Sequence, residues 1–217
     1  MEPWTIDEIG AALAAAMGSS PGEAKPRAAL RLRILQVASD HFERFGYRRT
    51  NIGDVARDAG IGKGSLYLHF DSKKTLLLAC LAYEKLALVP ELEATLELPA
   101  ADRLRRHLEI AFRFAIDAPL TSAFLRGDPE LVAAVAPYMA AHRNDRERSR
   151  AFMASLIDPG GQLSEPRRAV LVEAVHGLTA LTAHLPQHAE TLELQPERVG
   201  TTLAGLLARG VAAELAE

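Results

Sequence analysis

The stretch TNIGDVARDAGIGKGSLYLHFDSK, residues 50 to 73, predicts two short helices joined by a glycine turn. The first helix has an inward face of four apolar residues at helical spacing: Ile52, Val55, Ala56 and Ala59. Thr50 can cap this helix by accepting a hydrogen bond from a free backbone N–H. Gly60, just past the helix end, can take the left-handed conformation that a tight turn needs.

The second helix, roughly residues 63 to 70, places Leu66 and Phe70 on its inner side, one turn apart. Its outer side carries groups suited to phosphates and base edges: Lys63, Gly64, Ser65, Tyr67, Leu68 and His69. Arg48 and Arg49 precede the first helix, where a phosphate strand would pass. These features predict a helix-turn-helix that binds DNA.

This stretch resembles the DNA-binding end of the TetR family of one-component transcriptional regulators. The family pattern includes A-G-apolar-x-x-G-x-L-Y-x-H-F-x-S-K, and the matching residues here are Thr50, Val55, Ala56, Ala59, Gly60, Ile61, Gly64, Leu66, Tyr67, His69, Phe70, Ser72 and Lys73. Four residues depart from the pattern: Gly53, Gly62, Leu68 and Thr75. Gly53 and Gly62 should each cost about 1 kcal/mol or less of helix stability, and the core remains intact. The resemblance covers about residues 28 to 85.

The helix geometry and the resemblance together predict ten DNA-contacting residues: Arg48, Arg49, Thr50, Lys63, Gly64, Ser65, Tyr67, Leu68, His69 and Lys73. The predicted phosphate or backbone anchors are Lys63, Tyr67 and Lys73. The residues placed to read base edges or thymine methyl groups are Ser65, Leu68 and His69. The resemblance implies an inverted-repeat operator in double-stranded DNA, because a dimer presents two such helices.

Charge is distributed unevenly along the chain. The segment from Lys25 to Lys74 holds eleven Lys or Arg against five Asp or Glu, a formal charge of +6, whereas the whole chain carries −3. The remaining residues therefore carry −9. A cationic end on an acidic body suits a protein that docks one end on phosphate.

The rest of the chain predicts an all-α fold in three parts: an N-terminal extension, residues 1–25, a helix-turn-helix domain, residues 26–74, and an effector-binding and dimerisation domain, residues 75–217. Thr5 to Glu8 fits a capping box before a short amphipathic helix, so the extension is either a disordered tail or a helix that packs on the body or on the DNA-binding domain. Ser72 fits the N-cap of a long fourth helix that links the DNA-binding domain to the body. Body helices are expected over residues 102–117, 119–126, 129–157, 166–185 and 196–215, marked off by proline and glycine.

The resemblance implies an effector pocket in the body. Its candidate lining residues are Phe112, Phe114, Phe124, Tyr138, Met139, His142, Phe152, Met153 and His176. Taken singly, each of them is better explained as ordinary core, but together they would suit a small hydrophobic or amphipathic molecule with one polar end.

The last two helices combine Leu and Val with many small residues. Composition and resemblance together predict a homodimer through a four-helix interface, with close approach at Gly177, Gly200, Ala204 and Ala208. The alternative is that these are internal core helices.

Other classes of function are disfavoured by the sequence. No motif for nucleophilic or acid-base catalysis is present, and the spacing of His176 and His184, about 12 Å along one helix, is too long for one metal ion. The single cysteine, Cys80, fits a reducing cytoplasm, and no apolar run reaches the length of a membrane span. We therefore expect a cytoplasmic, ligand-responsive repressor without catalytic activity, metal or cofactor. The alternatives are a ligand-independent or activating regulator and, less favoured, a helical carrier or enzyme.

Overall fold

The computed structural model describes residues 2–19 and 24–216, and within these ranges it is helical, without strands. The helices are α1 Ile6–Ala16, α2 Lys25–Arg49, α3 Ile52–Asp58, α4 Lys63–Tyr67, α5 Lys73–Leu86, α6 Val89–Thr95, α7 Ala100–Asp117, α8 Pro119–Leu125, α9 Pro129–Ala141, α10 Arg143–Ile157, α11 Glu165–Thr182, α12 Leu185–His188 and α13 Pro196–Ala216. The predicted all-α fold class is confirmed.

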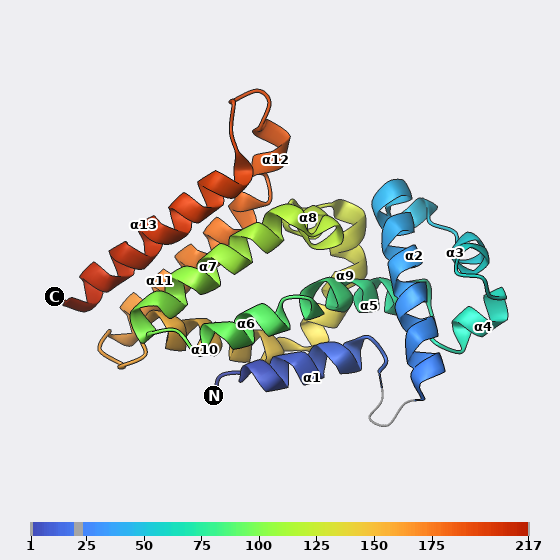
Figure 1. The fold of residues 1–217 in the computed structure, drawn as a ribbon, viewed down its shortest axis with the longest axis horizontal. Helices are drawn as coiled ribbons and strands as arrows, with labels where there is room; N and C mark the ends of the chain where they lie inside the picture. Colours follow the sequence, from blue (N-terminus) through green and yellow to red (C-terminus); the bar gives the residue numbers. More distant parts are fainter. Residues whose placement is uncertain (1, 20–23, 217) are drawn as a thin grey trace.

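The molecule is elongated, with two structurally distinct ends (Figure 1). Helices α2, α3 and α4 form one end, which we call the head, and α7, α10, α11 and α13 form much of the other, which we call the body. Helix α5 runs from the head into the body. Its N-cap is Ser72, whose Oγ accepts the backbone N–H of Thr75 at 3.0 Å, as predicted.

The head and the neighbouring part of the body share one hydrophobic core. Leu35 of α2, Leu66 of α4 and Leu77 of α5 are buried together with Leu120 of α8 and Leu131 of α9. Packing is therefore continuous across the predicted boundary between residues 74 and 75. That boundary stays a prediction.

Glu84 of α5 adds a polar link between α5 and the body. Its carboxylate accepts the backbone N–H groups of Leu120 and Thr121, both at 2.9 Å, at the start of α8. These N–H groups have no partner inside their own helix. The carboxylate thus fixes α8 against α5.

The N-terminal extension forms a helical strap, residues 4–17, between body and head. Its predicted capping box is present, because Thr5 and Glu8 exchange side chain to backbone hydrogen bonds. At the body end, the Trp4 indole donates to the carbonyl of Asp145 at 3.0 Å, and the Arg148 guanidinium lies 3.8 Å from the centre of its ring. At the other end, Met17 is buried in the core shared with the head.

A second hydrophobic core holds the body together. Leu108 and Phe112 of α7 pack there with Val172 of α11 and Ala204 of α13. The predicted helix over residues 129–157 is two helices, α9 and α10, because the backbone of His142 between them leaves helical geometry (φ −109°, ψ 45°). The other predicted body helices correspond to α7, α8, α11 and α13.

Candidate functional site

The helix-turn-helix is built as its sequence pattern predicts. The inward residues of α3, among them Val55 and Ala56, are buried, as are Leu66 and Phe70 around α4. Gly60 has φ +71°, the left-handed conformation expected of the turn. One prediction is wrong: Asn51, not Thr50, caps α3, through its Oδ1, which accepts the backbone N–H of Gly53 at 2.8 Å.

The outer face of α4 is open to solvent. Lys63, Gly64 and Tyr67 are exposed, and Leu68 at the end of the helix is 79% exposed. A Cβ atom placed at Gly64 would meet nothing within 4 Å, so another backbone can approach closely there. Ser65 and His69 are only partly exposed, at the edges of this face.

Helix α2 is kinked at Gly46 (φ 75°, ψ 166°), and we call the segment from this kink to Asn51, which includes the last residues of α2, the loop. The loop is held by groups outside it. The backbone N–H of Arg48 donates to Oε2 of Glu130 in α9 at 2.8 Å, and its carbonyl accepts from Nζ of Lys73 at 2.9 Å. The side chains of Arg48 and Arg49 are exposed beside α3 and α4. The structure therefore fixes the loop backbone and leaves the two arginine side chains at the surface.

Two predicted DNA contacts are placed differently from expectation. Thr50 is buried, and its hydroxyl donates toward the carbonyl oxygen atoms of Gly46 at 2.8 Å and His41 at 2.9 Å, so it supports the loop, and its contact with DNA stays a prediction. Lys73 is half-buried, with its ammonium 4.9 Å from the centre of the Tyr47 ring. Burial lowers the pKa of Lys73, and one of its three N–H groups is already used on Arg48.

A polar contact also fixes α3 against α2. Nε2 of His41 lies 2.9 Å from the Asp58 carboxylate at the end of α3. This hydrogen bond holds the pKa of Asp58 below its usual value. The sequence patterns did not single out this pair, because the two residues are 17 positions apart on different helices.

Four of the predicted effector residues divide between the two hydrophobic cores, Phe124 and Met139 in one and Phe112 and Met153 in the other, and the effector pocket stays a prediction. Phe112 is fully buried, and Met153 packs against the same body core, whereas His142 and His176 are exposed. Tyr138 stacks on His142 at 3.9 Å between ring centres. The other predicted lining residues are partly buried: Phe114, Phe124, Met139 and Phe152.

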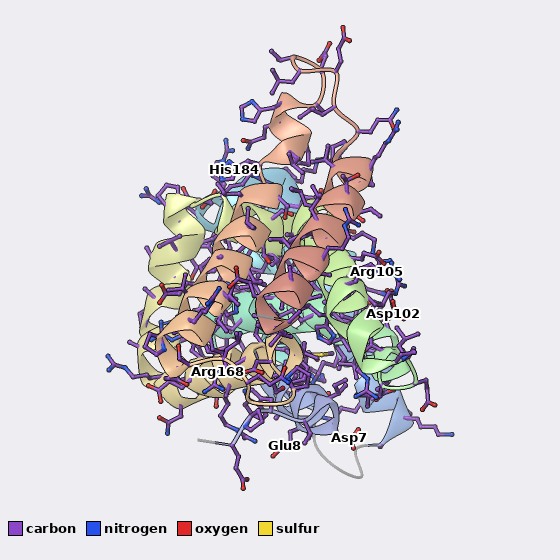
Figure 2. The ribbon with its side chains drawn as sticks, turned by 90° about the vertical axis from the view of Figure 1, so that its left-hand side faces the viewer. Asp7, Glu8, Asp102, Arg105, Arg168 and His184 are labelled. Carbon is purple, nitrogen blue, oxygen red and sulfur yellow. The ribbon has the colours of Figure 1, made fainter. Side chains whose placement is uncertain are left out.

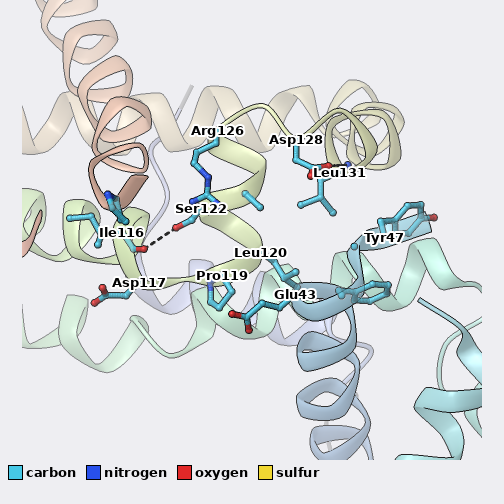
Figure 3. Close-up of a pocket in the computed structure, with 14 residues that line it drawn as sticks. Glu43, Tyr47, Ile116, Asp117, Pro119, Leu120, Ser122, Arg126, Asp128 and Leu131 are labelled. Atoms are coloured by element: carbon cyan, nitrogen blue, oxygen red, sulfur yellow. Dashed lines mark hydrogen bonds between the residues drawn. The ribbon is translucent and has the colours of Figure 1, made fainter. Parts of the chain in front are cut away.

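The structure instead has a hollow of about 310 Å³ between head and body (Figure 3). Phe42, Glu43, Gly46 and Tyr47 of α2 line one side, and residues of α7, α8 and α9 line the other. None of the nine predicted effector residues belongs to the described lining. The hollow carries no sequence signal, because it depends on how α2 meets α8.

His107 of α7 is a buried titratable group that the sequence analysis missed. It is 5% exposed, its Nδ1 has no hydrogen-bond partner among the described residues, and its ring lies 5.2 Å from that of Phe152. Burial lowers its pKa to about 4. The side chain is therefore neutral at physiological pH.

The predicted dimer residues divide into two groups. Gly200 and Ala204 are buried inside one chain, and a Cβ at Gly200 would lie 3.4 Å from that of Phe112, so the prediction that these two face a second subunit is wrong. Gly177 is exposed on α11 and Ala208 is partly exposed on α13. Small side chains at Gly200 and Ala204 instead allow α13 to cross α7 closely.

An apolar surface remains on these last helices. Helices α11 and α13 lie side by side on one face of the body (Figure 2). Val170 and Leu181 of α11 are 62% and 64% exposed, and Leu206 of α13 is 53% exposed. By length and composition alone α13 could also cross a membrane, with a mean hydropathy of 1.2.

Comparison with known proteins places the head in a described family. The family model "Bacterial regulatory proteins, tetR family" matches residues 34–80. The repressor KstR2 of Rhodococcus jostii (strain RHA1) is 45% identical over 47 residues, 22% of this chain and 23% of KstR2. The uncharacterized regulator YerO of Bacillus subtilis (strain 168) is 41% identical over 51 residues, 24% of this chain and 18% of YerO. The chain thus matches less than a quarter of these two relatives.

Solved structures extend the likeness to most of the chain. A TetR-like transcriptional regulator from Rhodococcus sp. RHA1 has a TM-score of 0.62 and 26% identity, covering 87% of this chain and 99% of the other. AibR, solved in complex with isovaleryl coenzyme A and operator DNA, has a TM-score of 0.53 and 18% identity, covering 80% and 95%. At 18% identity the likeness to AibR concerns the fold alone.

Proposed function

The chain belongs to the TetR family of transcriptional regulators, and from this premise we propose that it is a homodimeric repressor that a small molecule releases from an inverted-repeat operator. The observation that carries the proposal is the exposed face of α4 above a packed core. Lys63, Tyr67 and Leu68 stand at the surface there, and Gly64 leaves room for a phosphate backbone. An exposed leucine on such a helix suits contact with a thymine methyl group.

The proposed DNA contacts fall into two classes. Arg48, Arg49, Lys63 and Tyr67 would bind phosphates, which position the head without reading sequence. Leu68, with Ser65 and His69 at the edges of the face, would read bases. Lys73 would act mainly through the loop, because its ammonium supports the carbonyl of Arg48 at 2.9 Å.

The proposed dimer uses the exposed faces of α11 and α13. Val170, Gly177 and Leu181 lie along one side of α11. On α13, Leu206 adds an exposed apolar side chain, whereas Ala208, two positions further on, lies on the side of the helix that carries the buried Ala204. A second copy of the same face would cover these apolar side chains by twofold symmetry. It would also hold the two heads at a fixed distance, so that both α4 helices enter successive major grooves of one DNA face.

The proposed effector is a small, largely apolar molecule, and the protein would act in the cytoplasm. AibR was solved in complex with isovaleryl coenzyme A, and the screen for this chain should cover apolar compounds of negative, neutral and positive charge. A regulator that does not respond to a ligand is the second candidate, and the packing of Phe112 and Met153 into the body core favours it. Release of operator by any screened compound separates the two.

Selection of bound fragments from a random DNA library tests the DNA-binding proposal. We expect an inverted repeat whose half-sites lie about 34–36 Å apart or at a multiple of that distance. Replacing Leu68 with Ala should change the preferred bases, whereas Lys63→Ala should weaken binding to all sequences and reduce the salt slope by about one ion. Enrichment of no sequence, or an unchanged preference after Leu68→Ala, would contradict the proposal.

A further inference from the structure

The hollow between head and body has the surroundings of a ligand site. Its floor is apolar, because Phe42, Leu120 and Leu131 are buried there. Figure 3 shows Arg126 and Asp128 along one side and Asp117 and Glu43 along the other, with Ser122 and Leu120 between them. A volume of about 310 Å³ is at the lower end of the range for small-molecule pockets.

The polar groups around the hollow are mostly acidic. Three carboxylates and one guanidinium line it, a formal charge of −2. The guanidinium of Arg126 is partly engaged outside the hollow, because its Nη1 donates to the carbonyl of Ala183 at 3.4 Å. Asp128 uses Oδ1 to cap α9, whereas Glu43 and Asp117 are exposed and have no hydrogen bond in the described part of the chain.

The hollow is also next to the loop that precedes the helix-turn-helix. Gly46 and Tyr47 line it, and Arg48, the next residue, donates its backbone N–H to Glu130 at 2.8 Å. A molecule in the hollow would touch α2 and α8 together. It would therefore act directly on the angle between head and body.

We propose that this hollow is the effector site of the protein and that it takes a small organic cation, an aromatic or alkyl amine whose apolar part lies on the floor. A carboxylate of the lining, that of Glu43 or of Asp117, receives the ammonium, and the field of an acidic, half-enclosed hollow favours a cation over a neutral molecule. The site lies outside the interior of the body, where the sequence predicts the effector pocket. Its regulatory role rests on the proposed function.

Coupling to DNA follows from the position of the hollow. A ligand that contacts both head and body binds best at one angle between them, and DNA also binds best at one angle. When the two angles differ, the small molecule weakens DNA binding and DNA weakens the binding of the small molecule by the same factor, typically about 5- to 150-fold.

Calorimetry with three probes of one shape and different charge tests the site on the full chain without DNA. The probes are 2-phenylethylamine, 2-phenylethanol and phenylacetate. We expect the amine to bind at least about tenfold more tightly than the alcohol, and phenylacetate most weakly. Equal binding of amine and alcohol, or tightest binding of phenylacetate, would overturn the proposal.

Two sets of variants locate the binding. The double variant Glu43→Gln and Asp117→Asn should bring the amine within about threefold of the alcohol. A matched double variant, Glu97→Gln and Glu147→Gln, removes the same charge at exposed positions away from the hollow and should leave the preference intact. Ala123→Met should fill the hollow and weaken all three probes. Equal amine binding by wild type and the first double variant would place the site elsewhere.

Operator affinity then tests the regulatory part. Saturating amine should lower the affinity of the wild type for its selected operator at least about fivefold, and should change that of the Glu43 and Asp117 variant less than twofold. An amine that binds without changing operator affinity would overturn the assignment as effector site. Absence of operator binding in the ligand-free protein would instead overturn the proposed function, and the calorimetry would still decide the amine site.

Discussion

The head and the body are built by different rules, although both are helical. In the head, the two short helices α3 and α4 pack closely on the long α2, and Val55, Ala56 and Leu66 are almost fully buried on the inner side. In the body, longer helices leave apolar side chains such as Val170, Leu181 and Leu206 at the surface. Under the proposed function, the head would have to match the fixed geometry of a DNA groove, whereas the body would have to fit a second copy of itself and its own effector. The geometry that a DNA groove requires is common to many proteins and leaves a recognisable sequence pattern. The shape that one protein's own partner or ligand requires leaves no such pattern.

The proposed dimer depends on the exposed apolar side chains of the body. Leu181→Asp places a charge on the exposed face of α11, so we expect a monomer by light scattering. Operator affinity should then fall about 10²- to 10⁴-fold, because the second head no longer binds intramolecularly. Leu192→Asp, at a similarly exposed leucine between α12 and α13, is the control and should stay dimeric. A dimer that survives Leu181→Asp would move the interface to another face.

Two leucines in and next to α4, Leu66 and Leu68, differ in burial and should therefore differ in their effect on stability. Leu66→Ala removes a fully buried side chain and should lower the free energy of unfolding by about 2–5 kcal/mol. Leu68→Ala changes a side chain that is 79% exposed and should alter stability by no more than about 0.5 kcal/mol. Urea unfolding of both variants gives the two values. Similar losses would mean that Leu68 is part of the core.

Acid should act on the body through His107. Burial lowers the pKa of this side chain to about 4, whereas the unfolded chain titrates near 6.5. Between these values the unfolded state binds the extra proton, so stability should fall as the pH drops from about 6.5 to 4, by up to about 3 kcal/mol. His107→Phe should flatten this part of the stability profile, and His188→Phe, at an exposed histidine, should not. Unchanged acid sensitivity in His107→Phe would assign the effect to other groups.

The smallest expected effect concerns the strap. Arg148→Ala removes the guanidinium over the Trp4 ring and the ion pair with Glu8 at 2.8 Å, and should cost about 1 kcal/mol of stability. Arg146→Ala, two residues earlier on α10 and exposed, is the matched control. Thermal melting compares the two variants. Equal melting temperatures would show that the strap does not depend on this contact.

The features that the sequence predicts correctly are those that depend on residues close together along the chain. Periodicity and turn chemistry predicted α3, the turn at Gly60, α4 and the Ser72 cap, because each depends on residues close in sequence. The capping box of the strap was found for the same reason.

The failures concern contacts between distant segments. The roles of Gly200 and Ala204 depend on which side of α13 meets α7, and small residues suit a contact within the chain as well as one between chains. Thr50 was misplaced because its hydroxyl finds carbonyl groups at the end of α2, which periodicity does not show. The hollow beside Gly46 depends on how α2 packs against α7, α8 and α9. No local pattern encodes such packing.

The contact between Trp4 and α10 makes the protein its own optical probe. Trp4 is the only tryptophan in the chain, so its fluorescence reports one place alone. Its indole N–H is bonded to the Asp145 carbonyl and its ring is covered by Arg148, so separation of the strap from α10 would expose the ring to water and shift its emission to longer wavelength. Movement of α10 when a ligand or an operator binds can thus be followed in the unlabelled protein, in real time and without a change to the sequence.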